Sequence, residues 1–112
     1  MSLDVRTVGD VTILTPKGML LGGKETDELQ SKIKELAEAG SRKLLINLGN
    51  TTFMNSVSLG VLIAGHANYS KRDAKLKLCA VDKKIQSIFV VTKLSLVFEV
   101  FDEEAEALAS FK

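Results

Sequence analysis

Alternation of apolar and polar residues predicts strands at several points of the chain. In residues 3–18, two alternating runs flank Gly9 and Asp10, so a hairpin is expected there. Residues 43–48 read Lys-Leu-Leu-Ile-Asn-Leu. This nearly continuous apolar run is typical of a strand that is covered on both faces at the centre of a sheet. Two further strands are predicted at residues 75–81 and 96–101.

Apolar residues three and four positions apart predict four helices between and after these strands. The first runs through residues 25–39, with Gly40 as its stop signal, and the second through residues 57–69. A third, short helix follows Asp82, which is a favourable N-cap residue. The last helix, residues 102–111, opens with three acidic residues, which the helix dipole favours at an N-terminus.

The resulting order, ββαβαβαβα, determines the expected fold class. Repeated strand-helix-strand units need crossover connections, and right-handed crossovers make successive strands parallel. We therefore expect an α/β fold with a mixed, mostly parallel sheet and four helices. The 112 residues suit a single core, and no Ser-, Gly- or Pro-rich linker divides them, so residues 1–112 are predicted to form one domain.

Composition excludes several classes of function. The chain is 46% apolar and 26% charged, and no apolar run approaches the roughly 20 residues that span a bilayer, so no membrane insertion is expected. The N-terminus lacks a secretory pattern, which predicts a cytoplasmic protein.

The net charge of +1 argues against direct nucleic-acid binding. One cysteine, Cys79, and one histidine, His66, rule out a zinc site of two Cys and two His, and no metal or cofactor is expected.

Two segments resemble catalytic or nucleotide-binding motifs and depart from them at the decisive position. Residues 18–25, Gly-Met-Leu-Leu-Gly-Gly-Lys-Glu, nearly fit a phosphate-binding loop, but Glu25 stands where Ser or Thr should bind magnesium. Ser58 lies in a sequence similar to the G-x-S-x-G nucleophile motif. Its only histidine partner, His66, lies about two turns along the same helix, too far to act as its base. The chain is therefore not predicted to be an enzyme.

Ser56 is the remaining candidate for chemistry. Asn55 is a strong N-cap residue, which places Ser56 in the first turn of the helix that follows. Free N–H groups and the positive end of the helix dipole favour a phosphate at this position, and phosphorylation would add about two negative charges to the surface. Ordinary capping also accounts for Asn and Ser at a helix start, so both interpretations remain open.

The chain resembles the STAS domain, in particular the bacterial anti-sigma factor antagonists. The resemblance covers nearly the whole chain and is carried by the element order, by TFMNSVSLGVL before the second helix, by the strand KLKLCAV, and by the ending VFEVFDEEAEAL. In this family the loop commonly reads T-F-[IM]-D-S-S-G-L-G-V-L, and the serine after the aspartate is phosphorylated by the partner anti-sigma factor, a GHKL-type serine kinase. That serine aligns with Ser56.

The resemblance implies partner switching without catalysis. The unphosphorylated form binds the anti-sigma factor and frees the sigma factor, phosphorylation breaks the complex, and a phosphatase restores it. The expected partner-binding residues are Asn55, Ser56, Val57, Ser58, Leu59 and Gly60.

Several positions depart from the family pattern. Asn55 and Asn47 stand where the family has aspartates, Val57 and Ser58 where it usually has Ser and Gly, and Leu21 where many members carry an acid. A neutral Asn55 relieves repulsion against a phosphate on Ser56 but removes a carboxylate that a kinase could recognise. The alternative is a STAS scaffold, or an accessory subunit of a signalling or transport complex, that works without phosphorylation.

The sequence also predicts where four other side chains lie. Phe53 is expected in the core at the entry to the loop, and Phe98 and Phe101 beneath the last helix. The alternation in residues 75–81 places Lys77 on a wetter face of its strand.

Overall fold

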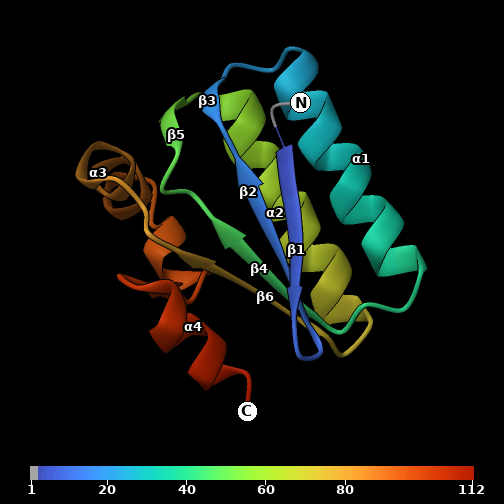
Figure 1. Cartoon of the computed structure of the whole chain (residues 1–112). Coiled ribbons are helices and arrows are strands. Elements are labelled where there is room, and N and C mark those ends of the chain that lie inside the picture. Colours follow the sequence, from blue (N-terminus) through green and yellow to red (C-terminus); the bar gives the residue numbers. More distant parts are fainter. Residues whose placement is uncertain (1–2) are drawn as a thin grey trace.

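Residues 3–112, which the computed structural model describes, form an α/β fold with helices on both faces of a sheet (Figure 1). The elements are β1 (Leu3–Val8), β2 (Val11–Pro16), β3 (Gly18–Leu20), α1 (Lys24–Glu38), β4 (Lys43–Asn47), β5 (Thr51–Met54), α2 (Ser56–Lys71), β6 (Lys75–Cys79), α3 (Lys83–Val91), a 3-10 turn (Leu94–Leu96), β7 (Val100–Phe101) and α4 (Glu104–Ser110). The four predicted helices and the N-terminal hairpin are confirmed. Among these residues, no helix combines the length and apolarity needed to cross a bilayer.

The main sheet has five strands in the order β1-β2-β4-β6-β7. β1 is antiparallel to β2, and every other neighbouring pair is parallel, so the predicted mixed, mostly parallel sheet is confirmed. Strand β4 lies in the centre, where Leu44, Leu45 and Ile46 have no exposed surface. A strand covered on both faces is what its continuous apolar run predicted.

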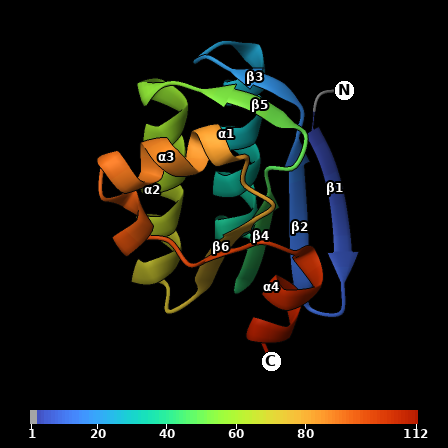
Figure 2. The ribbon, with the colours of Figure 1, turned by 90° about the vertical axis from the view of Figure 1, so that its left-hand side faces the viewer.

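A second, two-stranded sheet was not predicted. β3 and β5 pair in parallel and lie across one end of the molecule, at the top of Figure 2. Both strands are too short for alternation to reveal them. The prediction that Phe53 lies in the core is wrong: its neighbour Met54 points into the core, whereas Phe53 is 46% exposed on the opposite face of β5. Only one face of this short surface strand is covered, and successive side chains point to opposite faces. Met54 therefore anchors the start of the loop in the core, and Phe53 points to solvent.

Two hydrophobic cores lie on the two faces of the main sheet. The larger core is formed with α1, α2 and α3, and the smaller with α4 on the opposite face, as Figure 2 shows. Phe98 belongs to the larger core, where its ring lies 5.8 Å from that of Phe89 and 5.3 Å from that of His66. The prediction that Phe98 packs beneath the last helix is therefore wrong, whereas Phe101 packs against the smaller core beneath α4 as predicted.

The C-terminal part of the chain corrects two further expectations. The strand predicted over residues 96–101 is limited to Val100–Phe101, because the chain turns at Lys93 with a left-handed φ of 63° and then forms the 3-10 turn. Lys77 is only 6% exposed, because α4 covers its face of β6. Its ammonium donates to the carbonyl and hydroxyl of Ser110 at 3.1 and 2.9 Å and lies 4.7 Å from the centre of the Phe111 ring.

Candidate functional site

The candidate site is built around the N-terminus of α2, which a reciprocal set of hydrogen bonds holds in place. Asn55 is the N-cap, and its Oδ1 accepts from the N–H groups of Val57 at 3.1 Å and Ser58 at 3.2 Å. In return, the Ser58 hydroxyl accepts from the Asn55 N–H at 3.0 Å, which completes a capping box. The Asn55 amide also donates to the Leu21 carbonyl at 3.0 Å and ties the preceding loop to the helix.

Ser56 is the first residue of α2 and is exposed. Its hydroxyl has no hydrogen-bond partner within residues 3–112, since the cap is made entirely by its neighbours Asn55 and Ser58. The side chain is therefore free to react or to bind without disturbing the helix start. This geometry agrees with the N-cap prediction for Asn55 and with the first-turn position predicted for Ser56.

The six residues predicted to bind a partner do not share one environment. Ser56, Val57 and Gly60 are exposed and Asn55 is half-buried. Ser58 has no exposed surface and Leu59 is only 8% exposed. These two residues face the interior, where they support the site, so a partner could contact only the other members of the segment.

Exposed apolar side chains form a rim next to Ser56, and of these only Val57 was among the predicted partner-binding residues. Met19 is 56% exposed, Leu21 48%, Phe53 46% and Val57 54%. Pairing of β3 with β5 makes Met19 and Phe53 direct cross-strand neighbours. We call these four residues together with Ser56 the Ser56 surface. The two short strands that assemble it gave no periodic signal, although the buried neighbours Leu20 and Met54 imply an outward direction for Met19 and Phe53.

The loop that carries Leu21 lies against the start of α2. Gly22 has a φ of +91°, and a Cβ added to it would lie 3.1 Å from Cγ1 of Val57. Only glycine combines this left-handed conformation with so close an approach. The contact, together with the bond from Asn55 to Leu21, fixes the loop beside Ser56.

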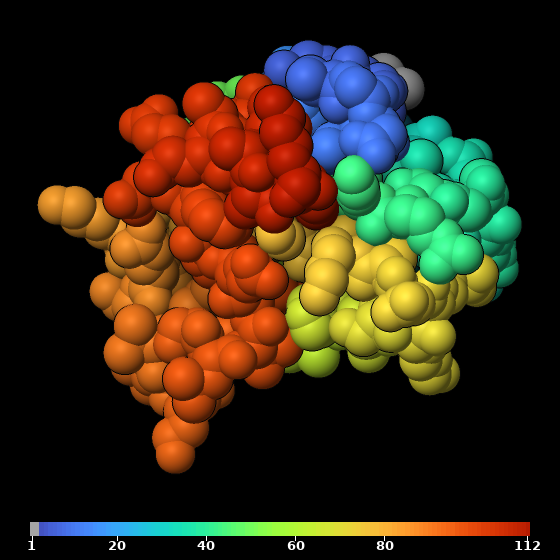
Figure 3. Space-filling view, turned by 90° about the horizontal axis from the view of Figure 1, so that it is seen from below, coloured from blue at the N-terminus to red at the C-terminus, as the bar shows by residue number. Residues whose placement is uncertain are grey.

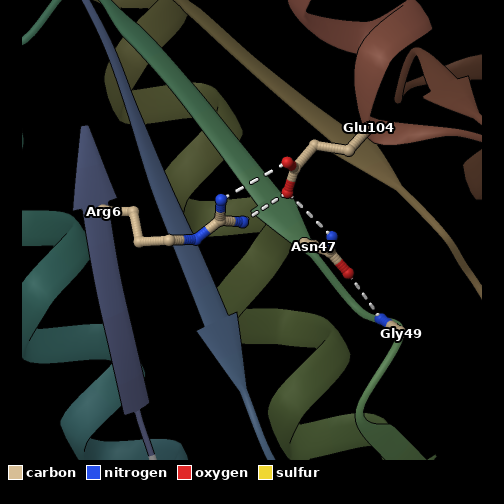
Figure 4. Close-up of polar contacts among 4 residues, drawn as sticks. All are labelled: Arg6, Asn47, Gly49 and Glu104. Carbon is tan, nitrogen blue, oxygen red and sulfur yellow. Dashed lines mark hydrogen bonds and ion pairs between the residues drawn. The ribbon is translucent and has the colours of Figure 1, made fainter. Parts of the chain in front are cut away.

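A polar network joins β1 and β4 to the start of α4 (Figure 4). Arg6 of β1 donates to Glu104 at the start of α4, with an Nη2 to Oε1 distance of 2.5 Å. The Asn47 amide donates to the same carboxylate at 3.0 Å, and the Asn47 Oδ1 accepts from the Gly49 N–H at 2.8 Å. Figure 3 shows the C-terminal residues packed beside the N-terminal hairpin.

This network lowers the pKa of the Glu104 carboxyl, chiefly through the hydrogen bond from Arg6. Burial opposes this effect, and the hydrogen bond from Asn47 lowers the pKa further. The amide of Asn47 suits this place because it donates to Glu104 with its nitrogen and accepts from Gly49 with its oxygen. Asn47 thereby orders the turn that leads from β4 to β5.

The two other motifs form ordinary structure. Residues 18–25 make β3 and the turn into α1, and Leu20 within them is completely buried, which a phosphate-binding loop would not allow. The Ser58 hydroxyl is used in the cap, and the His66 ring packs edge-on against Phe98. Cys79 is buried, and burial raises the pKa of its thiol to about 12. No group of three or more His, Cys, Asp or Glu residues that could hold a metal occurs in the described part of the chain, residues 3–112.

Comparisons with known proteins agree with this architecture. An anti-sigma-B factor antagonist of Staphylococcus aureus is 26% identical over 73 residues, which are 65% of this chain and 68% of that protein. A crystal structure of a Thermotoga maritima protein assigned to the anti-sigma factor antagonists superposes with a TM-score of 0.89 at 22% identity, over 96% of this chain and 92% of that one.

Phosphorylated SpoIIAA of Bacillus superposes with a TM-score of 0.79 at 15% identity, over 98% of this chain and 99% of that one. These structures confirm the predicted fold. The family model of the STAS domain matches residues 2–107, which is nearly the whole chain. This chain therefore belongs to the STAS domain family.

Proposed function

We propose that this chain is an anti-sigma factor antagonist, a regulatory domain that binds an anti-sigma factor through the Ser56 surface and is switched by phosphorylation of Ser56. The partner in this proposal is a GHKL-type serine kinase in the cytoplasm, and a phosphatase reverses the modification. Membership of the STAS family agrees with the prediction that the chain is not an enzyme, because anti-sigma factor antagonists are non-catalytic regulators. No direct contact with nucleic acid is required.

The observation that carries the proposal is an exposed serine hydroxyl beside four exposed apolar side chains. Contiguous exposed apolar residues mark interaction sites, and Met19, Phe53 and Val57 come from three different elements to form this one. A docked partner would cover the Ser56 hydroxyl. A phosphate there would have to lose its hydration against an apolar surface, which is unfavourable enough to break the complex.

The start of α2 can carry a phosphate without unfolding. Ser56 lies in the first turn, where backbone N–H groups and the helix dipole stabilise a negative charge. The neutral Asn55 adds no repulsion, and its amide is already engaged with Leu21. Two relatives support the proposal: the Staphylococcus aureus protein is an anti-sigma-B factor antagonist, and SpoIIAA exists in phosphorylated form.

A second function is favoured by one specific feature of the cap. Because Asn55 and Ser58 complete the capping box without the Ser56 hydroxyl, the helix start is also a finished structural unit that needs no modification. A STAS scaffold or an accessory subunit of a signalling or transport complex would use the same apolar rim with Ser56 as a spectator. The two functions differ in their response to Ser56→Asp: the antagonist loses its partner, whereas the scaffold keeps it.

The test begins with affinity purification of the tagged chain from its own cells and identification of the retained proteins. The proposal expects a protein with a GHKL-type ATP site, whose affinity is then measured by calorimetry for the wild type, Ser56→Ala and Ser56→Asp. We expect Ser56→Ala to bind like the wild type and Ser56→Asp to bind at least tenfold more weakly. Equal binding of all three would contradict phosphorylation switching.

A matched pair of valines tests the location of the surface. Val57 is 54% exposed beside Ser56, and Val90 is 65% exposed on α3. Val57→Ser is expected to weaken partner binding about fivefold, because full burial of a valine contributes about 1.5 to 3 kcal/mol and a partner would bury only the exposed half of this side chain, which leaves about 1 kcal/mol. Val90→Ser should leave the affinity unchanged. If Val90→Ser weakened binding and Val57→Ser did not, the partner would bind at α3, and the assignment of the Ser56 surface would be refuted.

A further inference from the structure

β1 is an edge strand with an uncovered outer side. It pairs only with β2 among the described residues, and Figure 2 shows no element of residues 3–112 beyond it in the plane of the sheet. Five of its six residues are exposed. Such an edge is a template for pairing with another strand, and proteins usually shorten, cover or block it.

The hairpin geometry determines which backbone groups face outward. Gly9, with a φ of +62°, begins a two-residue turn, and Val8 lies opposite Val11. In such a hairpin the residues that flank the turn form a hydrogen-bonded pair, and the pairs then alternate. The even-numbered residues of β1 therefore bond to β2, whereas the N–H and C=O groups of its odd-numbered residues point to the free side.

The two faces of β1 differ in character. Leu3 and Val5 line a shallow groove of about 600 Å³ beside α1. Its opposite wall is charged and is formed by Lys24, Asp27, Glu28, Lys32 and Glu35. On the other face of the sheet, Arg6 reaches Glu104 of α4, and by alternation Asp4 shares that face.

We propose that a second copy of this chain pairs with the free edge of β1, so that two β1 strands run antiparallel about a two-fold axis at Val5. In this register Val5 lies opposite Val5 of the second copy, and Leu3 lies opposite Thr7. On the other face Asp4 lies opposite Arg6, twice, once on each side of the axis. The strand is complementary to itself on both faces.

Charge complementarity favours this register over the two neighbouring ones, whose axes would pass through Asp4 and Arg6. An axis that passes through a residue keeps each face of the sheet continuous, since directly opposite residues share a face. An axis at Asp4 would oppose two aspartates, and one at Arg6 would oppose two arginines, and both arrangements are destabilising. The axis at Val5 instead makes two pairs of opposite charge in the non-hydrogen-bonded rows, where side chains approach most closely.

The existing contacts of Arg6 leave room for this pairing. Its guanidinium has five N–H donors, and two of its nitrogens contact Glu104. On the groove side, Leu3 and Thr7 of the second copy would extend the apolar row of Leu3 and Val5. No residue of the Ser56 surface belongs to β1, so the dimer would present two such surfaces at once.

Sedimentation of the full chain between about 10 μM and 1 mM tests the association, because a single pair of edge strands is a small interface and predicts a weak dimer. The wild type should shift from monomer to dimer over this range. Asp4→Arg would place an arginine opposite Arg6 of the second copy on both sides of the axis. This repulsion should raise the dissociation constant of the dimer at least tenfold. A wild type that stays monomeric to the highest concentration would overturn the proposal.

Two cysteine variants test the register. Val5 and Val8 are 47% and 45% exposed on the same strand, and the native Cys79 is buried. Opposed Val5→Cys residues would have Cα atoms about 5.5 Å apart, within reach of a disulfide, whereas Val8→Cys residues would lie six positions apart, about 20 Å. Mild oxidation should therefore crosslink Val5→Cys and spare Val8→Cys. Equal crosslinking of both variants, crosslinking of Val8→Cys alone, or of neither, would overturn the proposed pairing.

Discussion

Replacement of Asn47 by aspartate, the residue that the family usually has there, is predicted to destabilise this protein. The Asn47 amide donates to Glu104 at 3.0 Å, and Asn47→Asp replaces that donor with a second carboxylate. The bond from the Gly49 N–H to Oδ1 can persist, since a carboxylate also accepts. The substitution therefore changes one interaction and leaves the turn in place.

The expected loss of stability follows from two contributions. A hydrogen bond to a charged group contributes about 1.5 to 3 kcal/mol, and two like charges at about 4 Å repel by about 1 kcal/mol in water and more where water is excluded. The Glu104 side chain is 27% exposed and Arg6 can partly serve both carboxylates, which reduces the sum. We expect a loss of about 2 kcal/mol at pH 7, which lowers the Tm by about 8 °C for a domain of this size.

The effect should depend on pH with a definite sign. In the wild type the pKa of Glu104 is lowered, so its stabilisation is present above the ordinary pKa of glutamate and is lost as the pH falls through the folded value. In Asn47→Asp the paired carboxyls hold one pKa above its unfolded value, so the destabilisation is present at neutral pH and disappears as the pH falls towards about 4. The free energies of unfolding of the wild type and of Asn47→Asp should therefore become equal at acidic pH.

Urea unfolding followed by far-ultraviolet circular dichroism measures these free energies, and Glu104→Gln provides the control background. With the second charge removed, Asn47→Asp should cost less than 1 kcal/mol, because Gln can donate to the new carboxylate. An Asn47→Asp variant as stable as the wild type at pH 7, or equally destabilised with Glu104→Gln, would refute the assigned role of this network.

Three further predictions concern the supports of the Ser56 surface and the core. Asn55→Ala should lower the free energy of unfolding by about 1 kcal/mol through loss of the cap, whereas Asn55→Asp, which can still accept from the helix, should lower it less, as measured in urea. Gly22→Ala should lower the free energy of unfolding by about 1 to 2 kcal/mol, because the left-handed φ of +91° and the close approach to Val57 both disfavour a Cβ at this position. Thermal unfolding measures this loss, and an unchanged Tm would contradict the prediction. The thiol of Cys79, with a pKa of about 12, should not react with a disulfide reagent at pH 8 in the native state and should react once per chain in urea; fast native labelling would show that the strand is more accessible than its burial implies.

Much of the main fold could be predicted because its signals are local and repeated. The continuous apolar run of β4 and the helical periodicity of α1 reflect burial that extends over several turns or pairs, and the cap at Asn55 is encoded by adjacent residues. Each of these signals can be recognised within one continuous segment of the sequence. Sequence therefore placed Ser56 at the start of α2 correctly.

The features that escaped prediction depend on contacts between distant segments. β3 and β5 are stabilised by each other across more than 30 residues, and only their pairing directs Phe53 outward beside Met19. Lys77 is buried because α4 returns over β6. A single sequence carries no periodic signal for such encounters, so the place of Met19, Leu21 and Phe53 beside Val57 and Ser56 emerged only from the structure.

Site-resolved mass spectrometry of the protein isolated from its own cells, during growth and under stress, tests the central claim most directly. The proposed switch predicts a phosphorylated fraction in which the phosphate lies on Ser56 and which is absent from a Ser56→Ala strain. A protein that carries no phosphate under any condition, or one whose phosphate persists in Ser56→Ala, would contradict the switch.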